Sequence, residues 1–138
     1  MTALALPSPD APAAEWGRLA VSLPGWRWLP GMRAVDSTGE DTPGRVFDSS
    51  GFVVFEDQDR ELTEERVYLH DVPDPDDPAT AGCFLALLGP CEVGHDDTDP
   101  ECGPWSVEIP AHFRMGVTIG RAAISVAAAN GRWPGGGA

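Results

Sequence analysis

Four side chains in the second half of the chain belong to the residue types that bind zinc. Cys83, Cys91, His95 and Cys102 follow one another with seven, three and six residues between them. Zn²⁺ prefers thiolate and imidazole ligands, but structural sites usually place paired cysteines only about two to four residues apart. Cys83 also lies in an apolar stretch, where a cysteine packs as a small hydrophobic residue. We therefore expect free thiols and no bound metal. The alternatives are zinc held by Cys91, His95 and Cys102, or a disulfide between Cys91 and Cys102 that a reducing compartment would open.

Closely spaced carboxylates lie between the last two cysteines. Asp97, Asp99 and Glu101 alternate as ligands do in the first half of a calcium-binding loop. Cys102 stands where such a loop needs glycine, at its sixth position, although Glu108 occupies the twelfth. The helices that flank an EF-hand loop are not predicted here. We expect no dedicated calcium site and no cofactor.

Nucleophile and base candidates exist but form no recognisable catalytic motif. Cys91 could pair with His95 or His112, yet any chain of this size contains such pairs, and most are structural. The sequence has no glycine-rich phosphate loop, no serine in an elbow motif and no His-Glu-x-x-His. The prediction is a protein without enzymatic activity; a small enzyme or ligand-binding protein that uses residues 91–112 is an alternative.

The distribution of charge is the most informative chemical feature. Twenty of the 22 carboxylates lie within residues 36–108, where only Arg45, Arg60 and Arg66 oppose them, so this part carries a formal charge of −17. The two flanks carry +1 and +3, which gives −13 in total. Residues 67–113 contain ten acidic side chains and no arginine or lysine. Such a field repels nucleic acid and attracts basic surfaces.

Hydrophobic periodicity and turn residues divide the chain into short elements. An apolar face at helical spacing predicts a helix over 14–23, which Pro24 and Gly25 end. Acidic residues and Pro78 before an apolar run, with Gly89 after it, predict a second, buried helix. Strands are predicted over 33–35, 45–47, 52–56, 64–70 and 105–109, and an alanine-rich helix over 118–129. This order predicts an α+β fold, a small antiparallel sheet with about three helices packed on one face.

Length and composition predict a single domain. A chain of 138 residues can bury a substantial core, and we place the domain at 14–133 between a flexible N-terminus, 1–13, and a flexible tail, 134–138. No apolar run approaches the roughly 18 residues of a membrane span, and the start lacks the basic segment of a signal peptide. A cytoplasmic protein with no membrane contact is expected.

Two blocks of sequence, together with the alanine-rich terminal helix, resemble a recurrent family. Residues 23–32, LPGWRWLPGM, and residues 77–88, DPATAGCFLALL, are similar to those of small uncharacterised proteins from bacteriophages and prophages. The acidic, cysteine-bearing segment 91–102 departs from that pattern. The family has no assigned activity, so the resemblance implies a context, a phage accessory protein, and no particular chemistry.

These features predict a binding protein that inhibits a host nucleic-acid-handling or defence complex, such as a CRISPR effector, in the host cytoplasm. Its carboxylates would cover a cationic channel as phosphates do, without touching nucleic acid itself. Trp26 or Trp28 would serve as a hydrophobic anchor, although core packing of both is the alternative. A metal-stabilised structural or virion accessory module is the alternative function. The predicted contact residues are Asp71, Asp74, Asp76, Asp77, Asp96, Asp97, Asp99, Glu101, Trp26 and Trp28.

Overall fold

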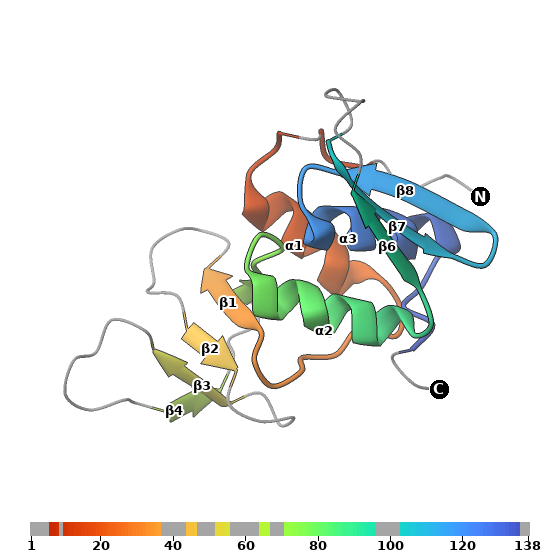
Figure 1. Ribbon diagram of the computed structural model, residues 1–138. Helices are drawn as coiled ribbons and strands as arrows, with labels where there is room; N and C mark the ends of the chain where they lie inside the picture. Colours follow the sequence, from red (N-terminus) through yellow and green to blue (C-terminus); the bar gives the residue numbers. More distant parts are fainter. Residues whose placement is uncertain are drawn as a thin grey trace.

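Three helices and eight strands make up the part of the chain that the computed structural model describes, residues 6–8, 10–36, 44–46, 52–55, 64–66, 71–95 and 103–135 (Figure 1). The helices are α1 (Ala13–Ser22), α2 (Pro78–Leu88) and α3 (Ile119–Asn130). The strands are β1 (Arg33–Asp36), β2 (Gly44–Val46), β3 (Phe52–Phe55), β4 (Glu64–Arg66), β5 (Asp71–Pro73), β6 (Glu92–His95), β7 (Trp105–Ile109) and β8 (His112–Gly116). The predicted α+β class is confirmed.

The first five strands form one antiparallel sheet in the order β4-β3-β2-β1-β5. β1 lies between β2 and β5, with Arg33 opposite Arg45 and Asp36 opposite Asp71. The predicted strands over 33–35, 45–47, 52–56 and 64–70 all correspond to strands of this sheet, within the described residues. β5 was not predicted, because the proline at its end reads as a turn.

A second antiparallel sheet, in the order β6-β7-β8, packs one face on α3 (Figure 1). The predicted strand 105–109 is its central strand, β7, and it buries Val107 and Ile109 on that face. The strands therefore form two antiparallel sheets, where the sequence led us to expect one. β6 and β8 were not predicted. Each is short, contains glycine and lacks a clean alternation of apolar and polar residues.

The helices begin and end where capping residues predict. The Asp77 carboxylate accepts a hydrogen bond from the Thr80 N–H at the start of α2, and Thr118 caps α3 through the Arg121 N–H. α3 ends at Gly131, whose φ of 86° is the left-handed conformation that favours glycine. Each predicted helix is confirmed to within about two residues.

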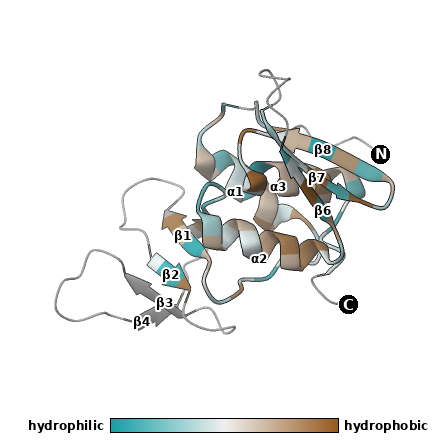
Figure 2. Ribbon diagram, viewed as in Figure 1, coloured by the Kyte–Doolittle hydropathy of each residue, from teal (hydrophilic) through white to brown (hydrophobic). Residues whose placement is uncertain are grey.

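The core lies among the three helices and the strands packed on them. Figure 2 shows apolar residues along the second half of α2 and in α3. Phe84 and Trp133 are fully buried, and the Trp133 indole donates to the Ala20 carbonyl at 3.0 Å, which fastens the segment after α3 to α1. Ala11 is also buried in this core, so the packed region begins before the expected residue 14.

Candidate functional site

The predicted contact residues fall into three groups. Asp74, Asp76 and Asp77 lie together between β5 and α2, and we call them the aspartate hub. Trp26 and Trp28 lie beside the core. Asp71 belongs to β5, but its side chain is outside the described part, as are Asp96, Asp97, Asp99 and Glu101 altogether.

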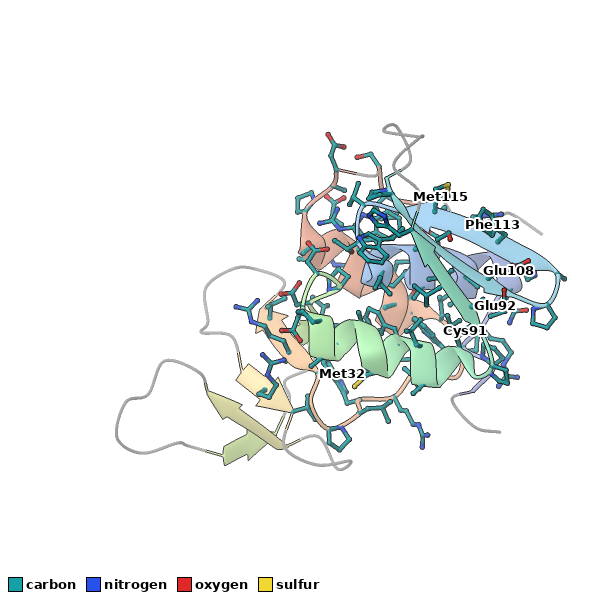
Figure 3. The ribbon with its side chains drawn as sticks, in the orientation of Figure 1. Met32, Cys91, Glu92, Glu108, Phe113 and Met115 are labelled. Atoms are coloured by element: carbon teal, nitrogen blue, oxygen red, sulfur yellow. The ribbon has the colours of Figure 1, made fainter. Side chains whose placement is uncertain are left out.

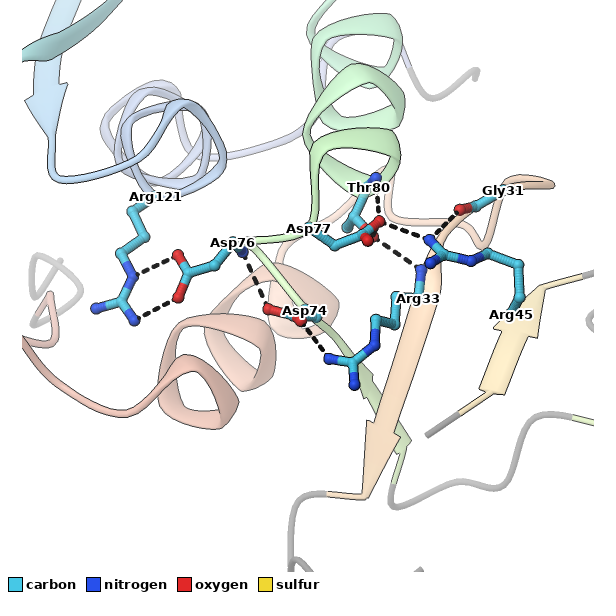
Figure 4. A network of polar contacts seen from close by, with 8 residues as sticks. All are labelled: Gly31, Arg33, Arg45, Asp74, Asp76, Asp77, Thr80 and Arg121. Carbon is cyan, nitrogen blue, oxygen red and sulfur yellow. Dashed lines mark hydrogen bonds and ion pairs between the residues drawn. The ribbon is translucent and has the colours of Figure 1, made fainter. Parts of the chain in front are cut away.

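Asp74 connects the hub to β1. Its carboxylate accepts a hydrogen bond from Arg33 Nη1 at 2.6 Å and another from the Asp76 backbone N–H at 3.0 Å (Figure 4). The Asp74 N–H also donates to the Arg33 carbonyl, at 2.9 Å. The residue is buried, with 9% of its surface exposed. This carboxylate is therefore an internal partner of Arg33 and not part of a free acidic surface.

Asp76 connects the hub to α3. Arg121, itself 7% exposed, donates from Nε and Nη2 to the two oxygens of Asp76, each at 2.9 Å (Figure 4). The Thr118 hydroxyl donates to the same carboxylate, also at 2.9 Å. Burial alone would raise the pKa of Asp76, but the hydrogen bonds from Arg121 and Thr118 outweigh it and hold the pKa below its ordinary value. Arg121 Nη1 also donates to the Ala11 carbonyl at 2.6 Å, so one guanidinium joins α3, the hub and the N-terminal segment.

Asp77 connects the hub to β2 while it caps α2. One of its oxygens accepts from Arg45 Nη1 at 2.6 Å and from the Thr80 N–H and hydroxyl, each at 3.0 Å. Burial opposes ionisation here too, yet the donors from Arg45 and Thr80 lower the pKa of Asp77. Thr80 is fully buried, and its hydroxyl oxygen accepts from the Arg33 N–H at 2.8 Å.

The hub therefore holds β1, β2, α2 and α3 together. The expectation that Asp74, Asp76 and Asp77 present unopposed charge is wrong, because each faces an arginine that lies 41, 45 or 32 residues away in the chain. No local sequence pattern reports such pairs. The one readable signal was Asp77 followed three residues later by Thr80, a spacing typical of a helix N-cap.

Trp26 and Trp28 pack against the core. Their rings meet edge to face with centroids 5.4 Å apart, and Trp26 also lies 6.0 Å from the rings of both Phe84 and Trp133. Both tryptophans are partly buried. Of the two readings left open by the sequence, this geometry supports core packing.

The candidate metal and catalytic residues are not brought together in the described part of the chain. Cys91 precedes β6 and His95 ends it, so an extended strand separates them by about 13 Å. His112 begins β8, where it lies opposite Ile109 of β7. The strand β7 therefore lies between His112 and β6, the strand that His95 ends. Among the described residues, no three His, Cys, Asp or Glu side chains form a metal-binding group. Cys102 lies outside these residues, so the set of Cys91, His95 and Cys102 stays untested.

The two described cysteines are free thiols with little nucleophilic character. Burial raises the pKa of Cys91, and burial followed by the nearby charge of Asp77 raises that of Cys83. The Cys83 thiol lies 3.5 Å from the Pro30 carbonyl oxygen. A raised thiol pKa is the opposite of what a catalytic cysteine needs.

A row of three residues that sequence reasoning did not select crosses the β6-β7-β8 sheet. Glu92 lies directly opposite Glu108, and Glu108 lies directly opposite Phe113. Residues directly opposite one another share a face, and since Val107 and Ile109 face α3, the row faces away from it. Figure 3 shows the three side chains following one another across the strands. We call this set the glutamate–phenylalanine row.

No protein-family model, curated protein or solved structure matches this chain. Within the described residues, no helix is both long enough and apolar enough to cross a membrane. What the protein does must therefore follow from its own charges and contacts.

Proposed function

We propose that this protein is a non-catalytic binding protein whose acidic surface covers the cationic, nucleic-acid-binding surface of another protein and thereby blocks it. The partner is a basic component of a host nucleic-acid-handling or defence complex, of which a CRISPR effector is one example. The carboxylates take the place of phosphates and meet the partner's arginines and lysines in charge-assisted hydrogen bonds.

The observation that supports this function is the charge that remains after the hub is formed. Among the described residues, three carboxylates form ion pairs in the hub, with Arg33, Arg45 and Arg121. The sequence of residues 36–108 contains seventeen further carboxylates, and besides Arg45 its only arginines are Arg60 and Arg66. The acidic excess in the sequence therefore belongs to the carboxylates outside the hub, and these are the ones that would meet a basic partner.

The described strands even place like charges against one another. Glu92 and Glu108 are direct neighbours on adjacent strands, and both are exposed. Directly opposed like charges destabilise a sheet. Acidic pairs that weaken the free protein are understandable if a basic partner neutralises them on binding.

The proposed context comes from the resemblance of residues 23–32 and 77–88 to phage and prophage proteins. Small acidic proteins of that origin commonly inhibit host nucleic-acid machinery. The site of action would then be the cytoplasm of the infected cell.

Capture from a bacterial lysate tests this function. The purified chain, immobilised at about 100 mM salt, should retain basic nucleic-acid-binding proteins, and a short DNA duplex should displace them because both ligands occupy one surface. A matched variant, D96N/D97N/D99N/E101Q, removes four carboxylates that the hub does not use, and it should retain less of the same proteins. Retained proteins that duplex DNA leaves in place would contradict the proposal.

A further inference from the structure

The glutamate–phenylalanine row combines two features that are unfavourable in an isolated protein. Glu92 and Glu108 are both exposed, and the Cβ atoms of directly opposed residues lie only about 5 Å apart, so their ionised carboxylates repel each other. Phe113, at the end of the row, exposes 50% of its surface. An ordinary solvated sheet face would carry a basic residue beside such acids and a polar residue in place of the ring.

Nothing in the described fold satisfies these side chains. The carboxylates of Glu92 and Glu108 make no hydrogen bond or ion pair with another described residue. The arginine nearest to the row in sequence, Arg114, lies opposite Val107, whereas Phe113 lies opposite Glu108. The Arg114 side chain therefore starts from the other face of the sheet. Its guanidinium donates to the Phe113 carbonyl at 2.9 Å.

A hollow of about 510 Å³ adjoins the two glutamates where the α2–β6 connection meets the β7–β8 turn. Its walls combine the carboxylates with apolar side chains, which suit a cationic ligand that has an aliphatic stem. The Cys91 thiol in this wall stays neutral, because burial raises its pKa. The lining residues are Pro90, Cys91, Glu92, Glu108, Ile109, Pro110 and Ala111.

We infer that the glutamate–phenylalanine row is an arginine-binding site, and that an arginine-bearing basic segment of the partner docks on this uncovered sheet face. Charge complementarity selects a cation, since two unpaired carboxylates stand side by side. The exposed ring selects arginine over lysine, because a planar guanidinium can stack on Phe113 while its N–H groups meet Glu108 or Glu92. This inference rests on the proposed function and assigns the centre of the contact.

Fluorescence anisotropy tests the site. It measures the affinity of the full chain for labelled peptides of nine arginines and of nine lysines. The wild-type protein should bind the arginine peptide about threefold or more tightly than the lysine peptide. E92Q/E108Q should weaken arginine-peptide binding about tenfold, because it removes both acceptors. F113L keeps an apolar side chain and should abolish the preference for arginine while leaving lysine-peptide binding unchanged.

The matched control is D10N/E15Q, which removes the same charge from the exposed Asp10 and Glu15 in the N-terminal part of the chain. It should change the affinity less than about twofold. Equal weakening by D10N/E15Q and E92Q/E108Q would overturn the site while leaving the proposed function standing. Failure of the wild-type protein to bind either peptide would overturn both the site and the proposed function.

Thermal unfolding checks that the variants fold. E92Q/E108Q should be at least as stable as wild type because it removes a repulsive pair.

Discussion

At the scale of single residues, three arginines connect elements that the apolar core alone does not join. Arg33, Arg45 and Arg121 each pair with one hub aspartate, and each pair joins elements distant in sequence. A charge placed at such a junction needs its partner, because an unpaired buried charge is far more costly than the intact pair is beneficial.

Arg121 gives the sharpest residue-scale prediction. R121L should lower the free energy of unfolding by about 2–3 kcal/mol, because the hub loses its link to α3 and Ala11 loses a hydrogen-bond donor. The loss lies below the roughly 3–5 kcal/mol expected for breaking a fully buried ion pair, because the Asp76 side chain is 37% exposed. Urea unfolding measures it. R114L, which removes an exposed arginine of β8, should stay within about 0.5 kcal/mol of wild type, and equal losses for the two variants would refute the special role of Arg121.

The hub also predicts how stability depends on pH. The pKa values of Asp76 and Asp77 are lower in the folded protein than the ordinary value of 3.8, so their contribution is complete above that pH and disappears as the pH falls through the folded-state values. D77N should therefore cost about 2 kcal/mol at pH 7 and progressively less below pH 3.8, because wild-type Asp77 is then protonated as well. Urea unfolding of both proteins from pH 7 down to about pH 3 follows the difference. A difference that does not shrink on acidification would show that the Asp77 charge is unimportant.

At the scale of elements, glycine contacts set how closely α3 approaches the hub. A Cβ added at Gly120 would collide with the Pro75 carbonyl oxygen, so G120A should push α3 away and cost about 3 kcal/mol or more. Gly82 in α2 offers the matched control, because a Cβ there meets nothing within 4 Å. G82A should stabilise the protein by about 1 kcal/mol through helix propensity. Thermal unfolding compares the two, and similar effects of both substitutions would contradict the close approach of α3 to Pro75.

The β7–β8 turn contains a strained residue next to the proposed arginine site. Ala111 has a φ of 72°, a conformation that costs a residue with a Cβ about 1–2 kcal/mol. A111G should therefore raise the free energy of unfolding by about 0.5–1 kcal/mol, the strain relief less the entropic cost of glycine. The control A129G, in the regular helix α3, should lower it by about 1 kcal/mol, as chemical denaturation can measure. Destabilisation by A111G would mean that the turn carries no such strain.

The elements also show which parts of the fold can be predicted from the sequence. Caps predicted the helices: Asp77 with Pro78 starts α2, and Gly131 ends α3. The second sheet was missed because β6 is four residues, Glu-Val-Gly-His, whose alternation is too weak to indicate a strand. The hub and the glutamate–phenylalanine row depend on which distant residues meet, Arg121 with Asp76 and Glu92 with Glu108. Local periodicity contains no information about such pairs.

At the scale of the whole molecule, the fold divides the acidic residues into two kinds. The hub aspartates pair with arginines and so join α2 and α3 to the first sheet. The remaining carboxylates keep the net charge at −13 and include a repulsive pair on an uncovered sheet face. The proposed function depends on the second kind, because the hub aspartates already have arginine partners.

Competition with DNA tests that central claim most directly. The basic protein retained most strongly from the lysate is first bound to a fluorescent DNA duplex, and this acidic protein is then titrated into the complex while anisotropy is recorded. Full release of the duplex, and an apparent affinity that weakens in proportion to added DNA, are predicted because both ligands need the same cationic surface. A stable ternary complex, in which the duplex stays bound while the acidic protein also binds, would contradict the account.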